Sequence, residues 1–226
     1  MDSSRTRKTL IEKLRKTNSD SRSWSECYEL YWKLVYSVAT KSGLSPQSAE
    51  DVVQETFIKV SKSIKKFEYD PKKGRFRSWL CLITKQQVAN YYRKKKNLPE
   101  LPSFWNEDPD KPLNEIPDPT NDWDAIWEDE DRKHTMNLAL QSLSEKCKPK
   151  PFKLFLAHCI KGMAVKEVAA QFQVSDNEVY LAKSRIMPQF EKEVRILSGN
   201  TDENKKNHQL DRKPLGLRYY AKNQVP

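Results

Sequence analysis

The chain has 226 residues and a formal net charge of +10, and it contains only five glycines. At roughly 100–200 residues per domain, this length predicts one or two domains. No apolar run is long enough to span a bilayer, and the N-terminal sequence MDSSRTRKTLIEKLRK lacks the apolar centre of a signal peptide. We therefore expect neither a membrane protein nor a secreted one.

The charge is distributed in three blocks along the chain. Residues 1–98 carry a net charge of +12, residues 99–136 a net charge of −9, and residues 137–226 a net charge of +7. Two basic blocks around an acidic connector indicate two modules that each meet a polyanion, and we favour nucleic acid as that polyanion. The alternative is a basic surface that serves solubility alone.

The cysteines and histidines are too scattered to form a metal site or a disulfide framework. Cys27, Cys81 and Cys147 stand alone, and Cys159 has only His158 beside it. This spacing predicts no metal and no cofactor, and it is typical of a reduced, cytoplasmic protein. A glycine-rich phosphate loop is also missing, so we expect no enzymatic activity.

Helical periodicity dominates the first part of the chain, and no alternating strand pattern occurs, so the predicted fold class is all-α. After a basic N-terminal extension at residues 1–21, which includes a weak helical pattern, residues 22–97 predict a module of three to four helices. Its first helix should stop at Gly43, and its second should be capped by Ser45 with Pro46 as the first helical residue. A turn at residues 68–76 precedes the third helix, for which Trp79 is predicted to be a core residue.

The second of these helices has two contrasting faces. Its apolar stripe consists of Ala49, Val53, Thr56, Phe57, Val60 and Ile64. The opposite face carries Asp51, Gln54, Glu55 and Lys59, with Ile58 in the middle. A solvated face has no use for Ile58, whereas an interface with an apolar centre and a polar rim does. The alternative is a scattered surface apolar residue, which is common.

Residues 98–133 are rich in proline and acidic residues and poor in helical period, so they predict an extended linker. Three tryptophans, Trp105, Trp123 and Trp127, are unusual in a free linker, and we expect parts of it to dock on a module. The helical period returns at about Met136.

Residues 134–197 have the organisation of a helix-turn-helix module. Ser175 and Glu178 form a capping box that should start the second helix of the motif. The outer side of that helix presents Asn177, Tyr180, Leu181, Ser184 and Arg185, as a recognition helix does. A helical hairpin with a solvated face is the alternative. Pro188 should kink or end this helix, and residues 198–226 are expected to be a disordered tail.

Two stretches resemble a known family. AEDVVQETFIKV followed by FEYDPKKGRFRSWL resembles region two of bacterial sigma factors of the sigma-70 family, and EVAAQF with VSDNEVYLAKSRI resembles their region four. The short length is similar to the extracytoplasmic-function group. The resemblance implies a subunit without chemistry of its own that binds core RNA polymerase and promoter DNA. An anti-sigma factor is a further candidate partner, which the sequence does not identify.

The resemblance also assigns roles to residues. It implies that the polymerase is bound by Asp51, Gln54, Glu55 and Ile58. It implies that the minus-ten element is held as a single strand by Phe76, Lys85, Gln86, Asn90, Tyr92, Arg93 and Lys94. The minus-thirty-five element would be bound by Lys166, Asn177, Tyr180, Lys183, Ser184 and Arg185.

Two of these positions depart from the family. Gln86 and Asn90 replace the Asn and Asp that the family usually has, and they continue the apolar stripe of the third helix, so buried amides are the alternative. The basic residues interleaved with aromatics suit a single strand, although a basic helix end can also serve only to complement the helix dipole.

A second function remains open from the sequence. A helix-turn-helix regulator that acts without the polymerase would use only residues 134–197. Such a protein has no need for the acidic face around Ile58, and that face is what distinguishes the two interpretations.

Overall fold

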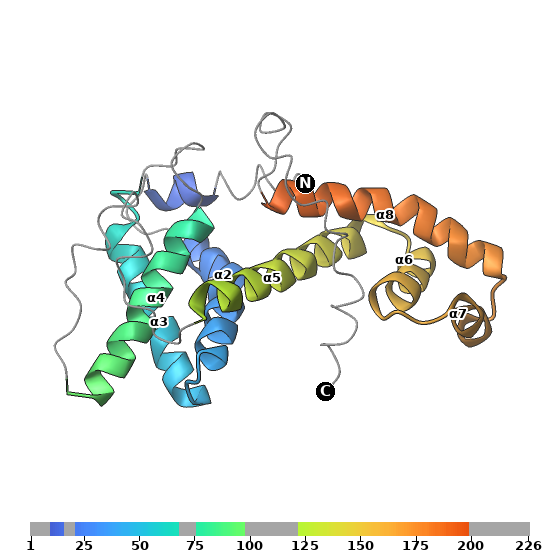
Figure 1. Cartoon of the computed structure of the whole chain (residues 1–226). Helices are drawn as coiled ribbons and strands as arrows, with labels where there is room; N and C mark the ends of the chain where they lie inside the picture. The colour runs from blue at the N-terminus through green and yellow to red at the C-terminus, as the bar shows by residue number, and fades with distance from the viewer. Residues whose placement is uncertain (1–9, 16–20, 68–75, 98–121, 199–226) are drawn as a thin grey trace, which may run out of the picture. The chain divides into compact units, whose positions relative to one another are not determined.

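The structure is a computed structural model that describes residues 10–15, 21–67, 76–97 and 122–198 (Figure 1). Within these residues all regular structure is helical, so the predicted all-α fold class is confirmed. The contacts divide the chain into a first unit that ends at His134 and a second unit that begins at Thr135. Each unit is described by itself.

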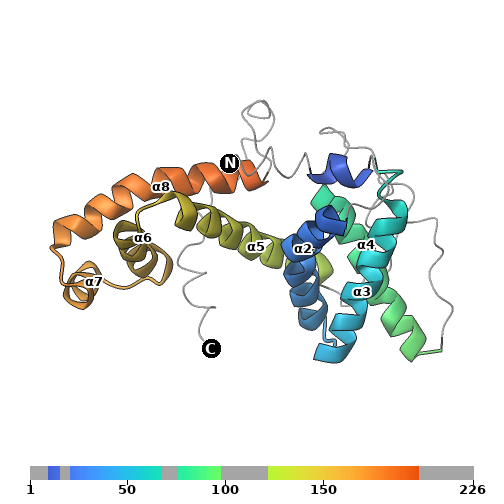
Figure 2. The same cartoon turned by 180° about the vertical axis from the view of Figure 1, so that it is seen from behind.

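The first unit is built on three long helices that lie side by side: α2 (Ser21–Lys41), α3 (Pro46–Ser63) and α4 (Phe76–Lys95) (Figures 1 and 2). The predicted end of α2 and the predicted start of α3 are confirmed. The backbone N–H of Ser48 donates to Ser45 Oγ at 3.3 Å, and Pro46 opens α3. Gly43 has a φ of +89°, where a side chain is strained, and a Cβ there would lie 3.0 Å from the Tyr92 hydroxyl.

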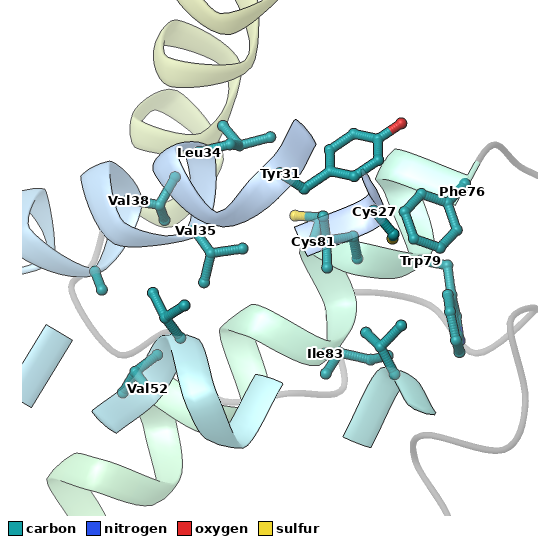
Figure 3. Packing of buried hydrophobic residues seen from close by; sticks show 14 of the residues in the cluster. Cys27, Tyr31, Leu34, Val35, Val38, Val52, Phe76, Trp79, Cys81 and Ile83 are labelled. Atoms are coloured by element: carbon teal, nitrogen blue, oxygen red, sulfur yellow. The ribbon is translucent and has the colours of Figure 1, made fainter. Parts of the chain in front are cut away.

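The core of the first unit combines aliphatic residues of all three helices with an aromatic cluster (Figure 3). Phe67 stacks on Trp79 with ring centroids 4.8 Å apart, and Trp79 is buried as predicted. Cys27 is also buried here, and burial raises the pKa of its thiol to about 12. The N-terminal extension contributes as well, because residues 10–15 are helical and bury Leu10, Ile11 and Leu14.

The prediction of an extended linker is wrong for residues 123–133, which form the first half of α5 (Trp123–Lys146). Trp123 and Trp127 stack on each other with centroids 6.3 Å apart, and both are buried in the core of the first unit. The indole Nε1 of Trp123 donates to Cys81 Sγ at 3.4 Å, and burial raises the pKa of that thiol to about 12. The expected docking is thus confirmed for these two tryptophans, whereas Trp105 lies outside the described residues.

Ion pairs fix the same segment to its unit. Arg77 of α4 contacts Asp131 at 3.0 Å, and Lys41 of α2 contacts Glu130 at 3.3 Å. The acidic residues that made this stretch resemble a linker therefore include partners for the basic module.

The second unit contains the rest of α5, then α6 (Pro149–Phe155), η3 (Leu156–Ile160), α7 (Val165–Phe172) and α8 (Asp176–Ser198). α6 and α8 lie side by side, and Phe155 and Phe190 meet with ring centroids 5.9 Å apart. Cys147 and Cys159 are half-buried, and burial raises the pKa of both thiols. The tail at residues 199–226, which we expect to be disordered, lies outside the described residues.

Two helices of the second unit have local irregularities. The helix that starts at Pro149 ends in a π-helical turn, where Lys161 N donates to Leu156 O at 2.8 Å. α8 continues through Pro188 to Ser198, so Pro188 does not end the helix. One missing backbone donor is tolerated because the residues around it, Ile186 and Phe190, are buried and hold both sides of the helix in place.

Candidate functional site

The first candidate surface is the acidic face of α3, defined as Asp51, Gln54, Glu55 and Ile58. All four side chains are exposed, and 44% of Ile58 is accessible to solvent. The opposite side of α3 fixes this orientation, since Ala49, Val53 and Val60 are buried in the core. The face therefore offers an exposed apolar side chain together with two carboxylates and an amide, a composition that suits a protein interface.

The second candidate surface, on α4, is only partly accessible. Phe76, Lys85, Gln86 and Asn90 are all buried, with Lys85 only 3% exposed. Phe76 belongs to the aromatic cluster, where it meets Tyr31 at 5.2 Å between ring centroids. The alternative that Gln86 and Asn90 are buried amides is thus the arrangement that the structure shows.

The C-terminal end of α4 carries the accessible part of this surface. Lys94 is exposed, and Tyr92 and Arg93 are half-buried. The Tyr92 hydroxyl donates to Ser42 O at 2.5 Å, and burial raises the pKa of this hydroxyl. Tyr92 therefore ties the end of α4 to the end of α2, and it presents a ring beside the exposed cations Lys94, Lys95 and Lys96.

The third candidate surface is the helix-turn-helix formed by α7 and α8. Ser175 N donates to Glu178 Oε2 at 3.1 Å, and Glu178 N donates to Ser175 Oγ at 3.3 Å, so the predicted capping box is present. The hydrogen bond that Ser175 N donates to the carboxylate, together with a 3.1 Å ion pair to Lys150, lowers the pKa of Glu178. Gln173 occupies the left-handed region in the turn, with a φ of 53°.

The outer side of α8 is accessible as predicted. Val179, Ala182 and Ile186 are buried against the rest of the unit. Exposed on the other side are Asn177, Tyr180, Leu181, Lys183, Ser184 and Arg185. Tyr180 is 55% exposed and Leu181 41%, and Lys166 is exposed on α7. The surface thus brings an amide, a hydroxyl, a ring and several cations onto one face, which can contact both base edges and phosphates.

Known proteins are similar to this chain over the segment that carries the first two candidate surfaces. Residues 27–98 match the family model of Sigma-70 region 2, and this range contains α3 with its acidic face and all of α4. The chain is also 30% identical over 155 residues to the ECF RNA polymerase sigma factor SigE of Mycolicibacterium smegmatis, a match that covers 67% of this chain and 54% of that protein. The first match places residues 27–98 in the Sigma-70 region 2 family.

The chain spans about half the length of the relative that it matches. The similarity to that relative extends over more residues than the region 2 match contains. No solved structure matches the chain.

In the described ranges, no group of three or more His, Cys, Asp or Glu residues is arranged to hold a metal ion. The helices of these same ranges include none that is long and apolar enough to cross a membrane.

One exposed feature of α2 was not predicted from the sequence. Tyr28 is 40% exposed. The signal that could have found it is the spacing of Tyr28, Trp32 and Tyr36 at four-residue intervals, which puts three aromatic residues along one side of a helix.

Proposed function

We propose that this chain is a sigma factor that binds core RNA polymerase through the acidic face of α3 and directs promoter recognition and transcription initiation. The observation that carries the proposal is Ile58, a large apolar side chain that is 44% exposed on the same face of α3 as Asp51 and Glu55, inside the segment that matches Sigma-70 region 2. Removing such a side chain from water stabilises a complex, whereas in the free chain it only exposes apolar area.

The two DNA-binding surfaces complete the proposal. The exposed side of α8 binds the minus-thirty-five element in the major groove, with Asn177 and Arg185 near base edges and Lys166 and Lys183 near phosphates. On α4, the accessible residues Tyr92, Arg93 and Lys94 hold the minus-ten strand by stacking and by phosphate neutralisation. In this proposal Phe76 and Lys85 contribute to the structure of α4 only, because their side chains are buried.

The deciding experiment is binding of the full chain to core RNA polymerase. The double variant Glu55→Lys, Ile58→Asp should lose co-purification with the core enzyme, because it reverses one charge and places another where the apolar centre was. Both positions are exposed, so the circular dichroism spectrum should remain helical.

A matched control is Glu145→Lys, which reverses an exposed charge in the second unit. It should co-purify as the wild type does. If the double variant also co-purifies unchanged, α3 is not the polymerase contact and the proposed function loses its support.

A further inference from the structure

The first half of α5 covers part of α4, the helix to which the proposed function assigns the minus-ten strand. The Arg77 guanidinium near the start of α4 lies 3.0 Å from Asp131 of α5, and both side chains are mostly buried. One turn further along α4, Cys81 Sγ accepts a hydrogen bond from the indole of Trp123 at 3.4 Å. Arg77, Cys81 and Lys85 follow one another at four-residue spacing, so they share one side of α4. Two of these three residues contact α5, and the third, Lys85, is only 3% exposed.

The two elements carry opposite charges. α4 contains five basic residues and no acidic one. Residues 122–131, which we call the acidic segment, contain no basic residue and six carboxylates, those of Asp122, Asp124, Glu128, Asp129, Glu130 and Asp131. The segment also contacts α2, because Lys41 lies 3.3 Å from Glu130. A polyanion that binds this side of α4 therefore has to compete with carboxylates that the chain itself supplies.

The acidic segment resembles a single-stranded nucleic acid in a second respect. Trp123 and Trp127 stack with ring centroids 6.3 Å apart and an angle of 20°, and both rings are buried in the core of the first unit. Carboxylates lie between the two tryptophans and after them along the chain. A single strand combines the same two elements, flat rings that stack and a row of negative charges. The segment thus has the chemistry of the ligand that α4 is proposed to bind.

We propose that the acidic segment is an internal competitor of single-stranded DNA: while docked it covers the first half of the strand-binding surface of α4, and the strand reaches this half only when the segment is released. The inference rests on the proposed function, in which Tyr92, Arg93 and Lys94 at the other end of α4 are the part that the strand reaches directly. A protein whose binding-competent form is a small fraction of the molecules binds its ligand more weakly by that fraction. The free chain should therefore bind single strands weakly.

The test compares two double variants of the acidic segment. The release variant, Glu130→Gln with Asp131→Asn, removes the carboxylates that contact Lys41 and Arg77. The control variant, Asp124→Asn with Glu128→Gln, removes two exposed carboxylates of the same segment and changes the net charge equally. Each full-length variant is titrated against a fluorescently labelled pool of single-stranded DNA of random sequence, and anisotropy gives the affinity. The release variant should bind roughly three- to thirty-fold more tightly than the control variant.

Hydrogen exchange measured by mass spectrometry reports the position of the segment directly. Saturating single-stranded DNA should make the amides of residues 123–131 exchange faster in the wild-type chain, because the strand displaces the segment. Thermal unfolding of every variant is measured as well. Asp131→Asn alone keeps the contact between Lys41 and Glu130, and it carries the comparison, with Asp124→Asn as its control, if the double variant fails to fold.

Each other outcome counts against the inference. Equal affinities of the release and control variants would overturn it, because only the net charge would then matter. Unchanged or slower exchange in residues 123–131 on addition of DNA would also overturn it, because the strand would bind without displacing the segment.

The proposed function is decided by a separate experiment. These titrations contain no polymerase, whereas the Glu55→Lys, Ile58→Asp variant is tested on the core enzyme. If no variant binds single strands at all, the inference and the role of α4 in DNA binding are overturned, and the polymerase contact of α3 still stands.

Discussion

Replacing Trp123 by alanine tests whether the first half of α5 is a structural part of the first unit. The side chain is 0% exposed, and it contacts both Trp127 and Cys81. A buried tryptophan removes roughly 150–250 Å² from water, which corresponds to about 4–6 kcal/mol at 25 cal/mol per Å². Measured losses for such truncations are about 3–5 kcal/mol, a large share of the roughly 5–15 kcal/mol that stabilises an ordinary protein.

Urea unfolding followed by circular dichroism measures this loss as a lower midpoint concentration. The Cys81 thiol provides a second, local measurement. Burial raises its pKa to about 12, so little thiolate is present at pH 8, and a thiol reagent should label it slowly. In the alanine variant the space beside the sulfur opens, and labelling should become faster.

Two controls accompany the measurement. Trp123→Phe keeps most of the buried area and should cost less than the alanine variant. Tyr180→Ala removes an aromatic side chain that is 55% exposed and should change stability by about 0.5 kcal/mol or less. An alanine variant of Trp123 with the wild-type midpoint and unchanged labelling of Cys81 would refute the docking of α5 on the first unit.

Four further predictions concern α7, α8 and the cap between them. Arg185→Ala should relax sequence specificity at one position of the DNA site, at a cost of roughly 1–3 kcal/mol. Lys166→Ala should instead weaken binding to all sequences alike and reduce the salt slope by about one. The two variants are distinguished by their binding to single-base variants of the site at two salt concentrations, and equal weakening of every sequence by both would make Arg185 a phosphate contact. Ser175→Ala should destabilise the second unit by about 1 kcal/mol through loss of the cap, measured by urea unfolding. Because the pKa of Glu178 is lowered in the folded chain, the stability that this carboxylate contributes should be present at neutral pH and lost as the pH falls through the lowered pKa. Pro188→Ala should raise the unfolding temperature, since it restores a backbone donor in the middle of a helix, and an unchanged temperature would mean that the proline is accommodated without strain.

The sequence predicts those parts of the fold that depend on local chemistry. The cap at Ser45, the stop at Gly43 and the capping box at Ser175 each arise from residues within a few positions of one another. The orientation of α3 is equally predictable, because the apolar residues repeat with the helical period and leave Asp51 and Ile58 outside.

The errors occur where distant residues decide the structure. Residues 123–133 have the composition of a linker, and only the partners supplied by α2 and α4, such as Arg77, turn the acidic residues into contacts of a docked helix. Pro188 carries a strong local signal to end a helix, yet the buried neighbours of α8 outweigh it. The burial of Lys85 and Phe76 likewise depends on how α4 is packed, which the pattern of one helix does not contain.

The state of the four cysteines bears on how such a protein can be controlled. Oxidants attack the thiolate, and in Cys27, Cys81, Cys147 and Cys159 the pKa of the thiol is raised above its usual value. At neutral pH each is held almost entirely in the protonated form, which reacts slowly with peroxides and disulfides. The folded structure therefore slows the reaction of all four thiols with oxidants, and unfolding of either unit should make them more reactive.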